Sequence, residues 1–229
     1  NAPFTLLVND DVELAPDYIK ILKTYLLQNP SVGAVSGKLL RPDGTIDTLG
    51  LHRSYTEKIS NIGEGLPDTK SDTQPKEVFG VSGTLPMYRR STVIQASHDG
   101  KLFDPEYQTY KEDVDLAYRF MHIGAKSIVI PAATAVHHRT FRKSLLHKGI
   151  SDYNAYHSYK NHWWNLLTHI SVWTFIKRSW AIIPFEIAKA VFIGSKHPKM
   201  LLHLIYDTFT HAKELRQKRG YFMSYESRR

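Results

Sequence analysis

Phe4-Thr-Leu-Leu-Val8 runs directly into Asn9-Asp-Asp11 near the start of the chain. The first segment is mostly apolar, which predicts a buried strand, and the polar residues follow at the end of that strand. Loops at strand ends build the binding sites of α/β domains. Carboxylate and amide oxygens are the ligands that hard divalent cations prefer. This stretch therefore predicts an α/β domain with a cation site at the rim of its sheet.

Length and composition fit one globular domain with an appended segment. The chain has 229 residues, of which 42% are hydrophobic and 23% are charged. It contains no cysteine, which excludes disulfides, thiolate zinc sites and cysteine nucleophiles. The chain begins at Asn1, and only eight residues precede the polar motif. We therefore expect that an N-terminal portion is missing.

The net charge of +8 is concentrated in the C-terminal part. Residues 1–136 carry 14 Lys and Arg against 17 Asp and Glu, a net charge of −3, whereas residues 137–229 carry 16 against 5, a net charge of +11. An anionic membrane and nucleic acid are both partners for such a segment. No DNA-binding helix or RNA-binding motif accompanies the charge, so we do not expect nucleic acid.

Residues 1–150 alternate between the periods of strands and helices. This order predicts an α/β domain with one layered sheet. The predicted elements are the strand 4–8, the helix 16–27, the strand 31–40, a long loop 52–76, a strand 78–90 interrupted by glycines, the helix 112–123 closed by Gly124, and the strand 126–130 ending at Pro131.

Residues 151–229 form an aromatic and basic helical segment, which ends in a basic tail over 213–229. The stretch 171–194 is apolar but is interrupted by charges, so it does not reach the ~18 to 20 apolar residues that span a bilayer. We expect peripheral contact with a membrane over residues 153–220, with Trp and Tyr at the level of the headgroups. The alternative is an ordinary packing helix with a basic outer face.

Three polar clusters in the first domain are candidates for chemistry: Asn9-Asp10-Asp11, Glu112-Asp113-Val-Asp115 and His137-His138. Each has a structural alternative. Acids in the first turn of a helix stabilise its dipole, and Asp115 and Arg119 have the spacing of an ion pair within a helix. A pair of histidines after a strand is more often structural than metal-binding. Only the three clusters together favour a catalytic or metal-binding site over these structural roles.

Five stretches of the first 140 residues carry a family resemblance: Leu6-Leu-Val-Asn-Asp-Asp-Val-Glu-Leu14, Gly83-Thr-Leu-Pro-Met-Tyr-Arg-Arg90, Phe103-Asp-Pro-Glu-Tyr107, Tyr110-Lys-Glu-Asp-Val-Asp-Leu-Ala-Tyr-Arg119 and Ala135-Val-His-His138. In this order they resemble the inverting glycosyltransferases of family 2, especially the rhamnosyltransferase-like branch. The resemblance implies the GT-A fold, an α/β mixed sheet flanked by helices, here without its first strands and followed by a helical membrane-interface segment.

The resemblance also implies a metal site. Asn9 and Asp11 match the outer positions of the family's Asp-x-Asp motif, with an amide in place of the first carboxylate. Asp11 and Asn9 would then bind Mn²⁺ or Mg²⁺, which neutralises the diphosphate of a nucleotide-sugar as it leaves. A family histidine lies at the same strand end as the histidine pair here. We expect His137 to be a further ligand, with His138 as the alternative.

Asp113 matches the family's catalytic base, and Glu112 lies beside it. We expect the neighbouring acids Glu112, Asp113 and Asp115 to raise one another's pKa, which suits a base near neutral pH. The predicted substrate contacts are Gly83, Thr84, Asp10 and Arg119, and Arg119 is also expected to support the helix through Asp115.

The resemblance implies a metal-dependent, inverting sugar transferase in polysaccharide or cell-wall synthesis. The donor would be a UDP-, dTDP- or GDP-sugar, and the acceptor a glycan or lipid-linked hydroxyl. We expect a cytoplasmic protein, peripheral at the inner face of the plasma membrane. One alternative is a metal-dependent phosphotransferase or hydrolase. Another is an inactive fragment that binds an anionic membrane or nucleic acid through its basic tail.

Overall fold

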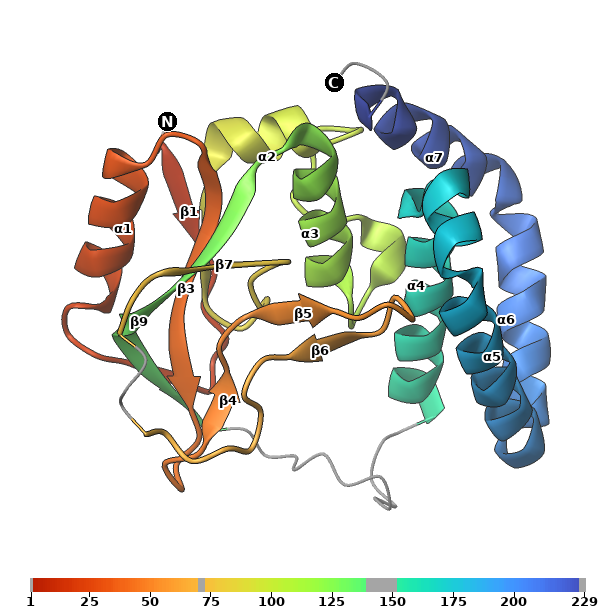
Figure 1. Cartoon of the computed structure of the whole chain (residues 1–229), viewed down its shortest axis with the longest axis horizontal. Coiled ribbons are helices and arrows are strands. Elements are labelled where there is room, and N and C mark those ends of the chain that lie inside the picture. The colour runs from red at the N-terminus through yellow and green to blue at the C-terminus, as the bar shows by residue number, and fades with distance from the viewer. Residues whose placement is uncertain (1, 70–72, 139–151, 227–229) are drawn as a thin grey trace.

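The structure is a computed structural model that describes residues 2–69, 73–138 and 152–226. Its centre is a mixed seven-stranded sheet with helices on both sides (Figure 1). The main path of the sheet is β1 (Phe4–Leu6), β8 (Pro86–Arg89), β3 (Val32–Leu40), β9 (Lys126–His137) and β2 (Val12–Leu14). β4 (Ile46–Thr48) pairs with β3, β7 (Lys76–Val78) pairs with β9, and β5 (Leu51–Arg53) and β6 (Ile59–Asn61) form a separate two-stranded sheet.

The parallel pair of β3 and β9 forms the middle of the sheet, and the other strands pair antiparallel. Almost all of β3 is buried because strands flank it on both sides and helices cover both faces. Its side chains alternate, so that Val35 and Leu39 join one core cluster and Ala34 joins the other. At Gly37 a Cβ would lie 2.1 Å from the carbonyl oxygen of Ala133, so only glycine fits.

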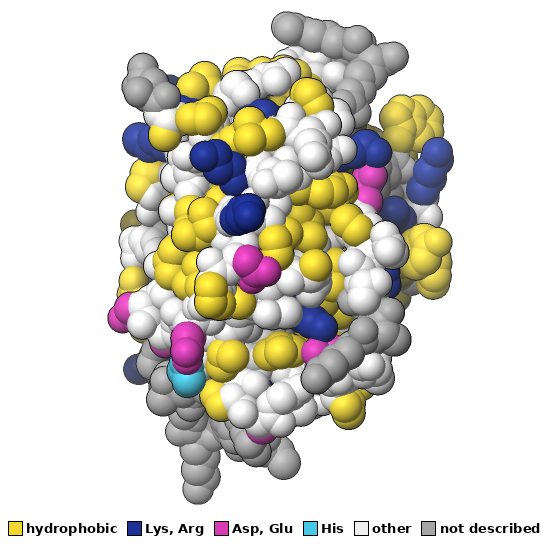
Figure 2. Space-filling model, turned by 90° about the vertical axis from the view of Figure 1, so that its left-hand side faces the viewer, with side chains coloured by type: hydrophobic (Ala, Val, Ile, Leu, Met, Phe, Trp, Pro, Cys, Tyr) yellow, Lys and Arg dark blue, Asp and Glu magenta, His cyan; other side chains and the backbone are white. Residues whose placement is uncertain are grey.

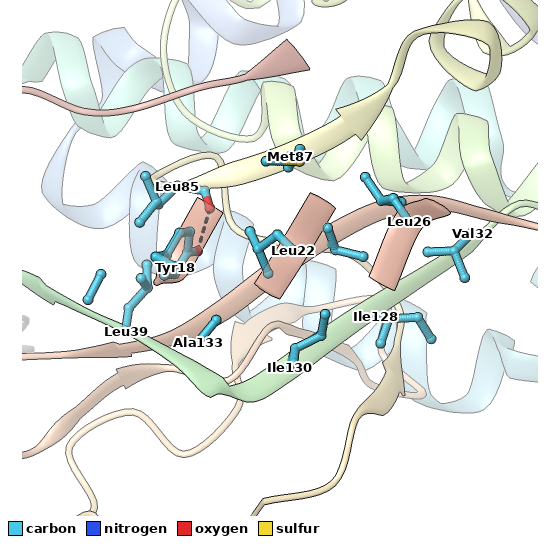
Figure 3. Packing of buried hydrophobic residues seen from close by; sticks show 12 residues of the cluster. Tyr18, Leu22, Leu26, Val32, Leu39, Leu85, Met87, Ile128, Ile130 and Ala133 are labelled. Carbon is cyan, nitrogen blue, oxygen red and sulfur yellow. Dashed lines mark hydrogen bonds between the residues drawn. The ribbon is translucent and has the colours of Figure 1, made fainter. Parts of the chain in front are cut away.

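Helix α1 (Tyr18–Gln28) covers one face of the sheet. Tyr18, Leu22 and Leu26 recur every fourth residue and point together into the core (Figure 3). The Tyr18 hydroxyl donates to the carbonyl of Leu85 at 2.9 Å and accepts from the amide of Gly37 at 2.8 Å, so it is fully satisfied. The face of the molecule on the side of α1 shows hydrophobic side chains among basic and a few acidic ones (Figure 2).

The opposite face is covered by α2 (Arg90–Ala96) and α3 (Glu112–Ile123). Leu116 and Phe120 of α3 pack with Ala34 and Tyr88 of the sheet. A short 3₁₀ helix (Pro105–Tyr107) precedes α3. Gly124 ends α3 in the left-handed conformation, and its amide bonds to the last turn of the helix. This layer holds the start of α3 close to the end of β1.

The C-terminal segment forms α4 (Asp152–His169), α5 (Val172–Lys196), α6 (Pro198–Thr210) and α7 (Ala212–Glu226). α4 and α7 contact α3, and α6 contacts α4, α5 and α7. These helices lie together on the right of the molecule in Figure 1. Within the described residues no helix is both long and apolar enough to cross a bilayer. The basic tail predicted over 213–229 is part of α7 as far as Glu226. The boundary at residue 150 stays a prediction.

Most predicted elements are confirmed, and three differ. The strand expected to end at Pro131 continues to His137, because pairing with β3 is interrupted after Ile130 and resumes at Thr134. The strand predicted over 78–90 is instead β7, an irregular segment and β8, because the glycines at 80 and 83 approach α3 closely. The loop predicted over 52–76 contains β6.

Candidate functional site

The end of β1 and the start of α3 are joined through the segment 83–84. The amide of Asn9 donates to the carbonyl of Thr84 at 3.1 Å. The amide of Gly83 donates to Oδ2 of Asp113 at 2.9 Å. A Cβ at Gly83 would lie 3.3 Å from Cβ of Asp113, so glycine permits this close approach. The structure therefore brings together Asn9, Gly83, Thr84 and Asp113, which the sequence analysis assigned to one site.

Asp11 and His137 are brought together by the pairing of β2 with β9, in which Val12 lies opposite His137. Nε2 of His137 is 3.2 Å from Oδ1 of Asp11. His137 is buried, whereas His138 is exposed and has its Nε2 3.4 Å from Glu13. Of the two alternatives, His137 is thus the histidine that faces the acidic motif.

Asp47 is a residue of this site that the sequence analysis missed. It lies in β4, it is buried, and its Oδ2 is 2.8 Å from Nδ1 of His137. A carboxylate on one ring nitrogen fixes the orientation of the imidazole and leaves the other nitrogen to face Asp11. The available signal was an acid within the short buried strand Ile46-Asp-Thr48.

The two carboxylates at the start of α3 have raised pKa values. Burial raises the pKa of Asp113, although the amide of Gly83 opposes this by bonding to the ionised form. Burial, followed by the charge of Asp113, raises the pKa of Glu112 to about 7. Oδ1 of Asp113 also accepts from the amide of Val114 at 2.8 Å. Asp113 is therefore held by two backbone amides, one on each oxygen.

Asp115 and Arg119 lie on the side of α3 that faces α4 and α7. Asp115 Oδ2 is 2.8 Å from Arg119 Nε, and Asp115 Oδ1 is 2.9 Å from Nε2 of His169. Burial opposes ionisation of Asp115, but Arg119 and His169 outweigh it, so its pKa lies below the usual value. The expectation that all three acids raise one another's pKa was wrong for Asp115. The buried Arg119 guanidinium donates to the carbonyls of Lys101 and Leu102, so the structure does not bring it to the carboxylate of Asp113.

The side chains around Asp11 supply only part of the ligand set of a divalent cation. Across 2–69, 73–138 and 152–226, no group of three or more acidic or histidine side chains is arranged to hold a metal. Oδ1 of Asp11 is nevertheless shielded from solvent, accepts no hydrogen bond there and faces His137. Asn9 and Asp10 are exposed beside it. One carboxylate and one imidazole fit a cation whose other ligands come from a diphosphate and water.

Sequence comparison identifies relatives but no family model that matches. Two proteins from Mycobacterium tuberculosis, of strains CDC 1551 / Oshkosh and ATCC 25618 / H37Rv, are each 29% identical to this chain over 153 residues. Both are named N-acetylglucosaminyl-diphospho-decaprenol L-rhamnosyltransferase. The match covers 59% of this chain and 47% of each relative, so the chain spans about half the length of these relatives.

Structural comparison identifies the fold. The crystal structure of GalNAc-T7 with UDP, GalNAc and Mn²⁺ superposes with a TM-score of 0.51 at 14% sequence identity, over 72% of this chain and 32% of that chain. At this identity the likeness concerns the fold alone, and it confirms the predicted GT-A architecture of a mixed sheet flanked by helices. In sequence this chain is thus similar to two L-rhamnosyltransferases, and in fold it is similar to a GT-A glycosyltransferase.

Proposed function

We propose that this chain carries the catalytic residues of an inverting transferase, which moves a sugar from a nucleotide-diphosphate-sugar to a hydroxyl of a glycan or lipid-linked acceptor. The observation that carries the proposal is the continuous run of contacts from His137 through Asp11 and the end of β1 to Gly83 and Asp113. The relatives named for diphospho-decaprenol and the neighbour solved with UDP support this donor and acceptor chemistry.

Asp113 is the proposed general base. The acceptor oxygen attacks the anomeric carbon from the face opposite the diphosphate, and its proton passes to the carboxylate of Asp113. The bonds from the amides of Gly83 and Val114 fix the position of that carboxylate, and its raised pKa favours proton uptake. Such a base contributes ~10²- to 10⁴-fold in rate. Glu112 lies beside it as a second acid that titrates near neutrality.

Asp11 and His137, with Asn9 beside them, are the proposed ligands of Mn²⁺ or Mg²⁺. The shielded Oδ1 of Asp11 and the imidazole held by Asp47 support this assignment. When bound, the cation neutralises the charge that develops on the diphosphate leaving group. Gly83, Thr84 and Asp10 are the proposed contacts of the donor sugar, because they belong to the two segments that connect this pair with Asp113. We place the reaction at the inner face of the plasma membrane, because the relatives are named for a decaprenol-linked acceptor.

The test is Asp113→Asn, assayed with UDP-, dTDP- and GDP-sugars and Mn²⁺. We expect at least a hundredfold loss of transfer, with the nucleotide affinity in calorimetry unchanged. Asp17→Asn is the matched control, because Asp17 precedes α1 and its side chain makes no capping bond. Full activity of Asp113→Asn would overturn the assignment of the base.

The same assay distinguishes sugar transfer from the main alternative, a metal-dependent phosphotransferase or hydrolase. A two-metal phosphotransferase or hydrolase needs more carboxylates than the described residues gather around Asp11. Such an enzyme would use water and release phosphate or nucleotide without an acceptor. Donor hydrolysis that does not depend on an acceptor, with no transfer product, would favour this alternative over sugar transfer.

A further inference from the structure

The solvent-facing side of α5 is a continuous apolar stripe. Its members recur every three or four residues, so they share one face of the helix. They are Trp173, Ile176, Trp180, Ile183, Ile187 and Val191, all of which are exposed. Trp173 and Trp180 are 73% and 71% exposed, which is unusual for the largest apolar side chain. A stripe of this length marks an interaction surface.

Helix α6 adds a second apolar face beside the first. Leu202, Tyr206 and Phe209 recur on its outer side, and Phe209 is 77% exposed. Only His197 separates α5 from α6, and the two helices pack against each other at the outer end of the molecule (Figure 1). We call these exposed apolar residues of α5 and α6 the hairpin face.

The charge around the hairpin face is mainly positive. Between Val172 and Phe209 the sequence holds five Lys and Arg and two acids, Glu186 and Asp207. Asp207 is half-buried and accepts from the Tyr156 hydroxyl of α4. Glu186 faces inward, where its Oε1 lies 2.7 Å from Nε2 of His162. Three of the cations are exposed beside the face: Lys177, Lys196 and Lys199. The surface therefore combines apolar side chains with positive charge.

We propose that the hairpin face binds a bilayer that contains anionic lipids. Trp and Tyr favour the level of the headgroups, apolar side chains enter the acyl boundary, and lysines pair with lipid phosphates. Because no described helix can span a bilayer, the binding is interfacial. The expected contact over residues 153–220 thereby narrows to α5 and α6. α4 and α7 pack inward on α3, and Trp164 of α4 is buried.

A polar connection links the hairpin face to the proposed catalytic helix. Arg178 of α5 donates to Oε1 of Glu57 at 2.6 Å, and Oε2 of the same carboxylate accepts from the Tyr118 hydroxyl of α3 at 2.9 Å. Glu57 is buried, so this link is shielded from water and salt. A bilayer bound at the hairpin face would therefore fix the position of α3 relative to the lipid surface. This inference rests on the proposed function and deepens it, because α3 carries Asp113 and the proposed acceptor is lipid-linked.

Co-sedimentation with vesicles tests the proposal on the whole chain. We expect binding to vesicles of phosphatidylcholine with phosphatidylglycerol and much weaker binding to phosphatidylcholine alone. Trp173→Ser with Trp180→Ser should weaken binding at least about tenfold, and Lys177→Glu with Lys199→Glu should reduce only the preference for the anionic lipid. The fluorescence of the wild-type protein should shift to the blue on binding, and the shift should be lost when both tryptophans are replaced by Phe.

The matched control is Ile19→Ser with Leu27→Ser, which removes two exposed apolar side chains, 48% and 61% exposed, from α1. This variant should bind vesicles like the wild type. Equal binding of the Trp173→Ser/Trp180→Ser variant would overturn the proposal. So would a wild-type dimer in sedimentation equilibrium that this variant converts to monomer, because the occupant would then be a second copy of the chain.

Failure of this inference is distinguishable from failure of the proposed function. Asp113→Asn should bind vesicles like the wild type, because Asp113 lies in α3 whereas the hairpin face consists of residues of α5 and α6. Transfer to a soluble acceptor without vesicle binding would refute the membrane contact alone. Vesicle binding without any transfer would refute the transferase alone.

Discussion

Helix α3 has two sides that are stabilised in different ways. Toward the sheet, Leu116 and Phe120 pack into an apolar cluster with β3 and β8. Toward α4 and α7, Asp115, Arg119 and His169 form buried ionic contacts. The first side contains no charge, whereas the second has several charges out of contact with water. One helix thus joins an apolar core to a polar interface.

The difference shows which interactions tolerate replacement. Truncating a buried apolar side chain lowers the free energy of unfolding roughly in proportion to the buried area and the volume that are lost. This cost does not depend on pH. A buried ionic contact offers little net stability compared with a hydrophobic pair, but removing one partner leaves a buried charge without its counterion. We therefore expect substitutions on the polar side of α3 to lower the free energy of unfolding more than those on the apolar side. The size of this effect should depend on pH.

The largest effect is expected for Asp115→Ala. It leaves Arg119 and His169 buried without their acid, which should cost ~3 to 5 kcal/mol in the free energy of unfolding. Denaturant unfolding at pH 7 measures this. The pKa of Asp115 is lowered in the folded state, so its stabilisation is present above the unfolded pKa and is lost as the pH falls through the folded value. The difference from the wild type should therefore shrink below about pH 4.

Leu116→Ala is the matched control on the apolar side. It should cost ~2 to 4 kcal/mol, and this cost should be the same at pH 4 and pH 7. A second comparison uses Asp115→Leu with Arg119→Met, which should recover part of the stability that Asp115→Leu loses alone. If Asp115→Ala costs no more than an exposed substitution, or if its cost does not depend on pH, the two sides of α3 do not differ as described.

The apolar side of α3 was predictable from the sequence, and the polar side was not. The period of Leu116 and Phe120 indicates a buried face, because apolar side chains gain by burial whatever their neighbour is. The partners of Asp115 depend instead on where α4 and α7 pack, and no local pattern specifies that. The sequence therefore predicted the i,i+4 pair with Arg119 but missed His169.

The same reasoning applies to the candidate site. Its motif residues Asp11, Gly83, Asp113 and His137 were predictable because short motifs in a fixed order carry them. Asp47 was missed because it reaches His137 only through the pairing of β4 with β3 and of β3 with β9. Arg119 has a motif position, yet its buried partners keep it on the other side of α3. Pairing between strands that are distant in the sequence thus determines contacts that local sequence patterns do not predict.

A smaller effect of opposite sign is expected for Glu112→Gln. Because the pKa of Glu112 is raised to about 7, the folded protein disfavours the ionised carboxylate. Wild-type stability should fall as the pH rises from about 4.5 to about 7, and the Gln variant should escape this loss. We expect the variant to be more stable by ~1 to 3 kcal/mol at pH 8 and equal to the wild type at pH 4. Thermal unfolding at both values checks this, and equal stability at pH 8 would refute the raised pKa.

The smallest effect on stability is expected at Asn161 of α4, on the polar side of the comparison. Its Nδ2 donates to the carbonyls of Tyr107, Thr109 and Tyr110 at 2.8, 2.9 and 2.6 Å. The loop it holds leads into α3 and has positive φ at Gln108, Tyr110 and Lys111. Each such residue costs ~1 to 3 kcal/mol and persists only if its surroundings fix it. Asn161 is thus a positioning residue for the start of α3.

Asn161→Ala removes the donor, so we expect faster amide exchange over residues 108–112 and a loss of transfer through kcat rather than KM. Asn165→Ala is the control, because Asn165 accepts from the Tyr107 hydroxyl but does not contact the carbonyls at 109 and 110. Each change should cost ~1 to 2 kcal/mol of stability. Only the change at Asn161 should move the exchange rates and kcat, because stability alone does not set the conformation of the loop. Equal effects of the two variants would mean that α4 stabilises the loop without positioning Asp113.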